Sequence, residues 1–303
     1  MGVAGAGLGQ ALAERVLVLD GGLATELEAA GHDLSDELWS ARLLRDDPDA
    51  ITAVHRAWVA AGADVLITAS YQASFEGFGR VGVPPEETTE LLRRSVSLAR
   101  AASPADRQVW VAGSIGPYGA TLADGSEYRG RYGRGIDELA EFHRRRMTAL
   151  TGARPDVLAL ETVPDVLEAR ALLKAAEDLP DDLPVWLSYT IDGDHTRAGQ
   201  PLDEAFELVT GVDRVIAVGV NCCRPEDVTP AIKVASAVTG KPVVAYPNSG
   251  EGWDAAAGRW CGPATFSAAR VGEWIDAGAR LIGGCCRVGP DQIAALRHAL
   301  STA

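Results

Sequence analysis

The chain has 303 residues, 47% of them hydrophobic and 23% charged, which is enough apolar material for a large buried core. It carries 28 Lys and Arg against 42 Asp and Glu, and the resulting net charge of -14 disfavours nucleic acid and anionic membrane surfaces as partners. No run approaches the roughly 20 apolar residues of a membrane span, and five cysteines, an odd number, do not suggest a secreted disulfide framework.

The N-terminal stretch, residues 1–13, is rich in Ala and Gly and only mildly apolar. It lacks the basic region of a secretory signal peptide, and Gln10 interrupts it shortly before Glu14. We therefore expect a disordered tail over 1–13 and a location in the cytoplasm. No linker divides the remainder, so residues 14–303 are expected to form one domain.

From residue 16 onward, short apolar runs alternate with longer helical patterns. The predicted strands are Val16–Leu19, Val65–Thr68, Val109–Ser114, Val157–Leu160, Val185–Ser188, Ile216–Val220, Val243–Tyr246 and Leu281–Gly284. The predicted helices are Leu23–Ala30, Asp49–Ala61, Glu87–Ala102, Ile136–Gly152, Asp165–Glu177, Leu202–Val209, Pro225–Val238, Ala264–Ala277 and Pro290–Leu300. The later strands recur about every thirty residues, the size of a βα unit. This alternation favours a closed (β/α)8 TIM barrel in a single domain, with a doubly wound open sheet as the alternative.

In such a barrel the chemistry lies at the carboxyl ends of the strands. Polar and sulfur-bearing residues follow the predicted strands at Asp20–Gly22, Thr68–Tyr71, Ser114–Gly116, Glu161–Thr162, Ser188–Tyr189, Asn221–Cys223, Pro247–Ser249 and Cys285–Cys286. The longest irregular stretch, Gly116–Gly135, follows the third strand and is rich in Gly and Tyr, so we expect an active-site loop there.

The cysteines at two strand ends indicate a metal centre. Cys222 follows one apolar strand, while Cys285 and Cys286 follow another, and adjacent cysteines are poorly suited to an ordinary disulfide. Three thiolates with an open fourth position fit zinc, whereas structural thiols or a redox pair are the alternatives. A zinc site of this kind would deprotonate an incoming thiol and make it a nucleophile. Cys261 lies outside a strand end and is expected to pack only.

Two carboxylates also stand at strand ends. Asp20 precedes Gly21 and Gly22, and Glu161 follows an apolar run. A helix N-cap and a solvated loop residue are the plain structural interpretations. Their shared placement instead favours a pair that holds an ammonium group, with backbone N–H groups of the two glycines open to a carboxylate.

Seven sequence blocks together resemble the zinc-dependent homocysteine S-methyltransferases, in the branch that uses S-methylmethionine or S-adenosylmethionine. The blocks are Asp20–Leu27, Thr68–Ala73, Gly113–Gly119, Asp124–Gly130, Glu161–Pro164, Gly219–Cys222 and Gly283–Cys286. The resemblance covers the chain from about residue 16 onward. It departs from the family pattern at Cys223, an extra thiol beside the expected ligand, although motif position favours Cys222.

The resemblance implies a barrel that transfers a methyl group from a sulfonium donor to homocysteine, forming methionine. It implies zinc on Cys222, Cys285 and Cys286, and homocysteine held by Asp20 and Glu161, the latter also counted as catalytic. The full predicted substrate-binding set is Asp20, Gly21, Gly22, Tyr71, Ser114, Glu161 and Asn221.

The methyl donor is the least determined partner. Aromatic faces attract cations such as a sulfonium, and the candidate aromatic residues in the expected mouth loops are Trp39, Tyr71, Tyr118, Tyr128, Tyr132 and Trp253. Tyr71, at the end of the second predicted strand, is the preferred candidate for the sulfonium contact. Its phenolic oxygen is also a candidate fourth zinc ligand. No Walker loop and no dinucleotide-binding glycine motif is found, so nucleotide cofactors are disfavoured. Zinc, on the three cysteines, is the expected cofactor. A betaine-using thiol methyltransferase and a non-catalytic zinc or thiol redox sensor remain alternatives.

Overall fold

A computed structural model describes residues 7–36, 38–254 and 259–302. Eight strands form the central sheet: β1 (Leu17–Val18), β2 (Val65–Ile67), β3 (Trp110–Ile115), β4 (Val157–Val163), β5 (Val185–Tyr189), β8 (Val215–Asn221), β9 (Val243–Tyr246) and β12 (Ala279–Ile282). All neighbours are parallel, in the order β1-β12-β9-β8-β5-β4-β3-β2. A parallel bridge between Leu19 and Val65 joins the two end strands. The sheet therefore closes, and the predicted (β/α)8 barrel is confirmed over the doubly wound alternative.

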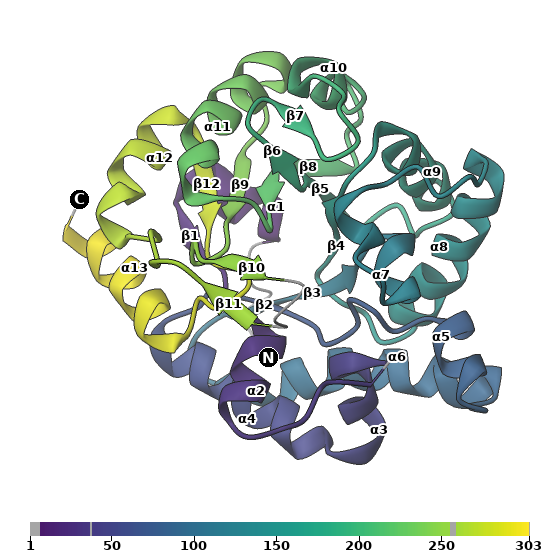
Figure 1. Cartoon of the computed structure of the whole chain (residues 1–303). Coiled ribbons are helices and arrows are strands. Elements are labelled where there is room, and N and C mark those ends of the chain that lie inside the picture. Colours follow the sequence, from purple (N-terminus) through teal and green to yellow (C-terminus); the bar gives the residue numbers. More distant parts are fainter. Residues whose placement is uncertain (1–6, 37, 255–258, 303) are drawn as a thin grey trace.

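The helices mostly surround the strands as an outer ring, with the first helix of the chain inside that ring (Figure 1). They are α1 (Leu8–Glu14), α2 (Leu23–Ala29), α3 (Leu43–Asp46), α4 (Pro48–Ala61), α5 (Phe75–Arg80), α6 (Pro85–Ala102), α7 (Tyr118–Leu122), α8 (Ile136–Thr151), α9 (Val166–Ala176), α10 (Leu202–Glu207), α11 (Pro225–Thr239), α12 (Val271–Ala277) and α13 (Pro290–Thr302), with short 3-10 turns η1 (Trp39–Arg42), η2 (Ser126–Tyr128) and η3 (Ala268–Arg270). None of the helices built from the described residues is long and apolar enough to cross a membrane.

Two small hairpins decorate the barrel. One pairs β6 (Ile191–Asp192) with β7 (His195–Thr196), and the other pairs β10 (Gly252–Asp254) with β11 (Arg259–Cys261). The eight barrel strands lie where the sequence predicted them, with ends that differ by a few residues. Helix α4 begins at Pro48, one residue before the predicted start at Asp49, and Asp47 caps it by accepting a hydrogen bond from the backbone N–H of Ala50 at 3.2 Å.

Residues 8–13 differ from the disordered tail expected over 1–13, whereas residues 1–6 of that prediction lie outside the described residues. Residues 8–13 lie in helix α1, and Leu8, Ala11 and Leu12 are buried. These three side chains belong to the same apolar cluster as the barrel-interior residues Leu17 and Trp110. Spacings of three and four residues place them on one helical face, which the Ala- and Gly-rich composition obscured.

The predicted helix Ala264–Ala277 begins later than expected. The backbone N–H groups of Thr265 and Phe266 donate to the carbonyl of Ser249 at 2.8 and 2.9 Å. This segment therefore hydrogen-bonds to the loop after β9 instead of forming the first turn of a helix. Ser267 then caps the turn η3 by accepting from the N–H of Ala269 at 3.3 Å.

Alternation along the strands decides which side chains enter the barrel. In β4, Val157 and Ala159 join the interior cluster, whereas Leu158 and Leu160 pack outward against the helices. The period of two residues then directs Glu161 inward at the carboxyl end of the strand. The same rule directs Ser114 inward at the end of β3. The barrel interior thus changes from apolar to polar at this rim.

Candidate active site

Three thiols meet at the carboxyl rim of the barrel. Cys222 directly follows β8, and Cys285 and Cys286 follow β12 after Gly283 and Gly284. Their sulfur atoms all lie within 4.8 Å of one another. Cys222 is buried, while the vicinal pair is half-buried. The structure therefore brings together the three cysteines that the sequence singled out as metal ligands.

Backbone contacts fix this thiol cluster. Cys222 has a left-handed backbone with a φ of 49°, a conformation that L residues adopt rarely. The Thr190 hydroxyl, which donates to the Cys222 carbonyl at 3.1 Å, helps to hold it there. The loop after β9 supports the pair, because the Cys285 N–H donates to the Pro247 carbonyl at 2.8 Å and the Cys286 N–H donates to Oδ1 of Asn248 at 3.1 Å.

The three thiols share their protons unequally. Hydrogen bonds from Cys222 and Cys285 lower the pKa of the Cys286 thiol well below its usual value. Hydrogen bonds with Cys222 and Cys286 raise the pKa of the Cys285 thiol well above the usual value. These hydrogen bonds favour the thiolate form of Cys286, which is the form that binds a soft cation.

The other two cysteines are separate from this cluster. Cys223, the neighbour of Cys222, is buried in the apolar core outside the strands, where burial raises the pKa of its thiol. Cys261 is exposed in β11. Of the two adjacent thiols after β8, Cys222 is thus the one that faces the vicinal pair, as motif position favoured.

Two buried carboxylates lie at the same rim, near enough for the charge of Glu161 to raise the pKa of Asp20. Asp20 is 2% exposed, and its Oδ2 accepts a hydrogen bond from the Ile67 N–H at 2.7 Å, while its buried Oδ1 has no hydrogen-bond partner. Glu161 is 5% exposed. It accepts a short hydrogen bond from the Ser114 hydroxyl and one at 3.0 Å from the Tyr246 hydroxyl.

Burial dominates the acidity of both carboxylates. It raises the pKa of Asp20 well above its usual value, against the Ile67 hydrogen bond, and the negative charge of Glu161 adds to the rise. Burial raises the pKa of Glu161 to about 7, against the hydrogen bonds from Ser114 and Tyr246. A cation placed between these carboxylates would offset the cost of burying them, so the pair suits an ammonium group.

A buried hydrogen-bond network braces these groups from below. The Oδ1 atom of Asn221 accepts from the Thr162 N–H at 2.7 Å and from the Ser188 hydroxyl at 2.8 Å, and its Nδ2 donates to the Thr162 hydroxyl at 2.7 Å. Ser188 in turn lies 2.8 Å from the Tyr246 hydroxyl. The amide of Asn221, predicted to contact substrate, thus joins the ends of β4, β5 and β8.

The glycines after β1 serve close packing. A Cβ on Gly22 would lie 2.5 Å from the Cys285 carbonyl oxygen, so only glycine lets the start of α2 approach the thiol pair. The Gly22 N–H donates to the Val288 carbonyl at 3.1 Å, which differs from the expectation of an open N–H group at this position. Gly21 also packs closely, because a Cβ there would lie 2.2 Å from the Val288 carbonyl oxygen.

The candidate aromatic residues separate into two groups. The Tyr128 hydroxyl hydrogen-bonds Cys286, and burial followed by the charge on Cys222 raises the pKa of Tyr71 well above its usual value. Both therefore lie at the thiol cluster. Tyr118 and Tyr132 instead pack against each other with ring centroids 5.4 Å apart. Trp39 is exposed in η1, and the side chain of Trp253 lies outside the described residues.

A buried arginine that sequence reasoning missed holds the tip of β2. Arg146 in α8 is fully buried. It donates to the carbonyls of Ala73 at 2.9 Å, Gly116 at 2.8 Å, Ser70 at 3.2 Å and Tyr71 at 2.7 Å. Its place on the buried helical face was the available indication, because Arg146 lies four residues after Phe142 and four before Leu150.

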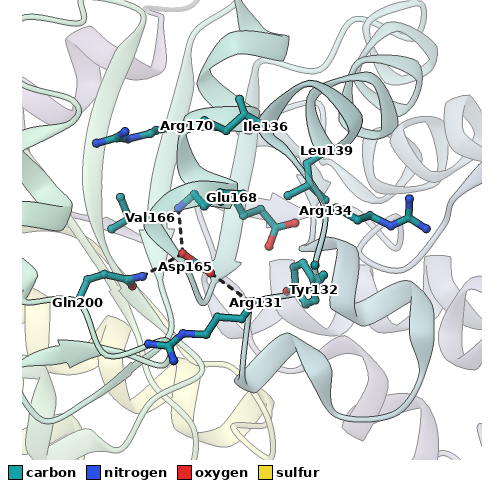
Figure 2. A pocket seen from close by; sticks show the side chains of 12 residues that line it. Arg131, Tyr132, Arg134, Ile136, Leu139, Asp165, Val166, Glu168, Arg170 and Gln200 are labelled. Carbon is teal, nitrogen blue, oxygen red and sulfur yellow. Dashed lines mark hydrogen bonds between the residues drawn. The ribbon is translucent and has the colours of Figure 1, made fainter.

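The predicted active-site loop Gly116–Gly135 is fastened on its outer side by Asp165, which caps α9, and by Glu168 in the first turn of that helix. Oε1 of Glu168 accepts from the Tyr118 N–H at 2.6 Å. Asp165, at the centre of Figure 2, accepts from the Arg131 N–H at 3.1 Å, the Gln200 side chain at 3.0 Å and the Leu167 N–H at 2.9 Å. A hollow of ≈ 580 Å³ lies here between the loop, α8 and α9, and it is a feature of the outer ring instead of the barrel mouth.

The fold and the site define a (β/α)8-barrel protein with a thiol cluster suited to a metal and a pair of buried carboxylates at its catalytic rim. The chain belongs to the homocysteine S-methyltransferase family, whose sequence model matches residues 17–300.

Close relatives cover nearly the whole chain. It is 45% identical to homocysteine S-methyltransferase 4 of Zea mays, over 94% of this chain and 90% of that protein. It is 42% identical to homocysteine S-methyltransferase YbgG of Bacillus subtilis, over 95% of this chain and 96% of that protein. The solved structure of the Escherichia coli homocysteine methyltransferase MmuM in its metallated form superposes with a TM-score of 0.84 at 42% identity, covering 94% of this chain and 96% of that one.

Proposed function

We propose that this protein transfers a methyl group from a sulfonium donor to the sulfur of homocysteine, with zinc held by Cys222, Cys285 and Cys286. The observation that carries the proposal is the convergence of these thiols, within 4.8 Å of one another, beside the buried carboxylates of Asp20 and Glu161. A thiol-activating centre next to an ammonium site matches a substrate that is both a thiol and an amino acid. Relatives that bear the homocysteine S-methyltransferase name support it.

The thiol cluster fits zinc by geometry and by chemistry. Sulfur ligands at about 2.3 Å from a tetrahedral ion lie roughly 3.8 Å apart, inside the observed limit. Thiolates are soft ligands that select zinc over hard oxygen-seeking cations. The metallated form of MmuM supports a metal at this kind of site. Zinc, when bound, would keep the thiols deprotonated and lower the pKa of an acceptor thiol.

The protein residues bind and orient the acceptor. Asp20 and Glu161 hold the homocysteine ammonium group, which directs the substrate sulfur toward the thiol cluster. Tyr246 and Ser114 favour the ionised form of Glu161 by donating hydrogen bonds to its carboxylate. Fixing both ends of a small substrate in this way supplies the alignment that displacement at carbon requires.

The reaction balances without a further cofactor. A bond forms between the homocysteine sulfur and the donor methyl carbon, and the bond from that carbon to the donor sulfur breaks. Its electron pair stays on the donor sulfur, which becomes a neutral thioether, and the proton of the homocysteine thiol leaves to water. With S-methylmethionine as donor, both products are methionine.

S-methylmethionine is the preferred donor in this proposal, ahead of S-adenosylmethionine and betaine, because no adenosine-binding motif is evident in the sequence. Its net charge of +1 matches an acidic protein with a net charge of -14. We further expect a cytoplasmic location, where a reducing environment keeps the vicinal thiols Cys285 and Cys286 free for metal.

The test measures zinc content and methionine formation by the purified protein with homocysteine and each of the three donors. We expect bound zinc and the highest kcat/KM with S-methylmethionine. Preference for betaine would overturn the donor assignment. Bound zinc without turnover on any donor would replace the enzyme by the sensor alternative. A Cys261→Ser variant, altered at an exposed thiol outside the cluster, serves as the matched control and should retain both zinc and activity.

A further inference from the structure

The turn η2 carries a buried carboxylate that the proposed reaction has not used. Glu127 is only 6% exposed, and its Oε2 is buried without a hydrogen-bond partner. Helix α7 lies directly on this turn, because a Cβ on Gly119 would lie 2.5 Å from the Glu127 backbone nitrogen. Burying a carboxylate in this way is costly unless a cation accompanies it.

The surroundings of Glu127 place it at the barrel mouth. The next residue, Tyr128, hydrogen-bonds Cys286 through its hydroxyl, so the turn lies over the thiol cluster. The charge of Glu127 contributes to the raised pKa of Tyr71, and the charge of Cys286 contributes to the raised pKa of Glu127, after the larger effect of burial in each case. The carboxylate is thus near both site tyrosines and the thiols.

Among the residues that the structure describes, Arg129 is the cation whose charge lowers the pKa of Glu127, but it makes no hydrogen bond to the Glu127 Oε2. Arg129, the basic residue nearest in sequence, is 64% exposed and pairs with Asp124 at 3.4 Å on the surface. A second buried acceptor in this region also lacks a partner, the carboxamide oxygen of Gln72, whose Nε2 donates to the Ala120 carbonyl of α7 at 3.3 Å. This region therefore presents two buried acceptor oxygens without a hydrogen-bond partner, Oε2 of Glu127 and Oε1 of Gln72.

The chemistry of the substrates decides which cation fits. An ammonium group donates three hydrogen bonds. The Asp20 and Glu161 pair already provides acceptors for one ammonium group, that of homocysteine. A sulfonium carries a positive charge and no N–H or O–H, so it is recognised by charge and by aromatic faces alone. A buried carboxylate oxygen without a hydrogen-bond donor, near two tyrosine rings, suits that cation.

We propose, building on the function proposed above, that Glu127 binds the sulfonium group of the methyl donor, together with the rings of Tyr71 and Tyr128. The carboxylate holds the positive sulfur near the thiol cluster and makes the site prefer the cationic donor to its neutral thioether product. Glu127 thereby determines donor specificity, whereas Asp20 and Glu161 determine acceptor binding.

The experiment compares the wild-type protein with Glu127→Gln, Glu127→Asp and Glu141→Gln. Glu141 is 62% exposed and pairs with Arg144 on α8, so Glu141→Gln makes the same change in net charge away from the barrel mouth. The readouts are zinc content, the KM values for homocysteine and for S-methylmethionine, and calorimetric binding of S-methylmethionine. The inhibition constant of dimethylsulfoniopropionate, a sulfonium without an ammonium group, is measured in competition with the donor.

We expect Glu127→Gln to raise the donor KM and Kd by about 30-fold or more, the usual consequence of removing one partner of a desolvated charge pair. Zinc content and the homocysteine KM should stay unchanged, and Glu127→Asp, which keeps the charge, should show a smaller rise. The inhibition constant of dimethylsulfoniopropionate should rise by a similar factor. Glu141→Gln should match wild type.

Other outcomes overturn the inference in distinct ways. Equal donor affinity in Glu127→Gln and wild type would remove Glu127 from the donor site. A loss confined to S-methylmethionine, with dimethylsulfoniopropionate unaffected, would assign Glu127 to the ammonium group instead. Donor binding that depends on Glu127 in a protein without methyl transfer would support this inference and overturn the proposed function, so the two failures are distinguishable.

Discussion

Tyr246→Phe is expected to move the acid limb of the pH profile for homocysteine methylation upward. In the wild-type protein, burial holds the pKa of Glu161 near 7 even though Ser114 and Tyr246 both donate hydrogen bonds to its carboxylate. Those bonds favour the ionised form. Removing the Tyr246 hydroxyl therefore raises the pKa of Glu161 further, and the ammonium site is lost at a higher pH.

The magnitude follows from the lost hydrogen bond. A hydrogen bond to a charged group contributes about 1.5–3 kcal/mol, and one pKa unit corresponds to about 1.4 kcal/mol. The limb should therefore move from near 7 to roughly 8–9. At pH 7 the ionised fraction of Glu161 falls from about half to about 1–10%, and kcat/KM for homocysteine should fall roughly 5- to 50-fold.

The assay is kcat/KM for homocysteine from pH 6 to 9.5 at saturating donor, with zinc content and the thermal midpoint measured at each end. Substrate titrations are common to both proteins, so the difference between the profiles isolates Glu161. Glu161→Gln is the control and should show low activity with no such limb. A Tyr246→Phe limb that stays near 7 would refute the role assigned to this hydrogen bond.

Changes at the thiols, at the second acceptor carboxylate and at the buried arginine have separate expected outcomes. Replacing Cys222, Cys285 or Cys286 by serine should lower zinc content and abolish methyl transfer. Zinc binds a hydroxyl poorly in place of a thiolate. Cys223→Ser should keep zinc and lose some thermal stability, and full zinc occupancy in Cys222→Ser would contradict the ligand choice. Asp20→Asn should raise the homocysteine KM by about 30-fold or more with zinc retained, and an unchanged KM would place the ammonium elsewhere. Arg146→Lys leaves buried carbonyls unpaired, at about 1–3 kcal/mol each, so it should lower the unfolding midpoint and raise the donor KM, whereas Arg145→Lys, half-exposed beside it, should do neither.

Much of the fold was readable from the sequence, because a barrel strand is buried on both sides and therefore appears as a short apolar run. The run Val243–Tyr246 was predicted with the ends that the structure has. Placement of chemistry at strand ends then followed from parallel topology, and it correctly grouped Cys222 with Cys285 and Cys286.

The parts that could not be predicted depend on register and on contacts between distant segments. Nothing local to Tyr246 indicates that its hydroxyl reaches Glu161, because that contact requires the relative heights of β4 and β9 in the barrel. The late start of the predicted helix Ala264–Ala277 has the same origin, since the Ser249 carbonyl takes two of its N–H groups. Helical periodicity could have placed Arg146 on the buried face of α8, although the sequence analysis missed it, but it could not reveal the four carbonyl partners.

Burying carboxylates without a cation lowers the free energy of unfolding of the protein without substrate. Asp20 allows that decrease to be measured. Its Oδ1 is buried without a partner, and burial raises the pKa of Asp20 well above its usual value. The folded protein therefore binds a proton that the unfolded chain releases near pH 3.9. Between that pH and the raised folded value, stability falls as pH rises, by up to about 1.4 kcal/mol per pH unit.

Asp20→Asn removes this titration while keeping the shape of the side chain. Because burial raises the pKa of Asp20, the folded wild type is protonated there to the greatest extent at the acid end of the range, where the variant and the wild type should differ least in unfolding temperature. As pH rises toward 8, the variant should become the more stable of the two, although it binds homocysteine worse. Unfolding midpoints of the isolated proteins across this range test the argument, with the surface change Glu141→Gln as the control for net charge. A gap that stays constant with pH, or a variant less stable than wild type at pH 8, would show that the Asp20 carboxylate is not an unpaired charge in the folded protein.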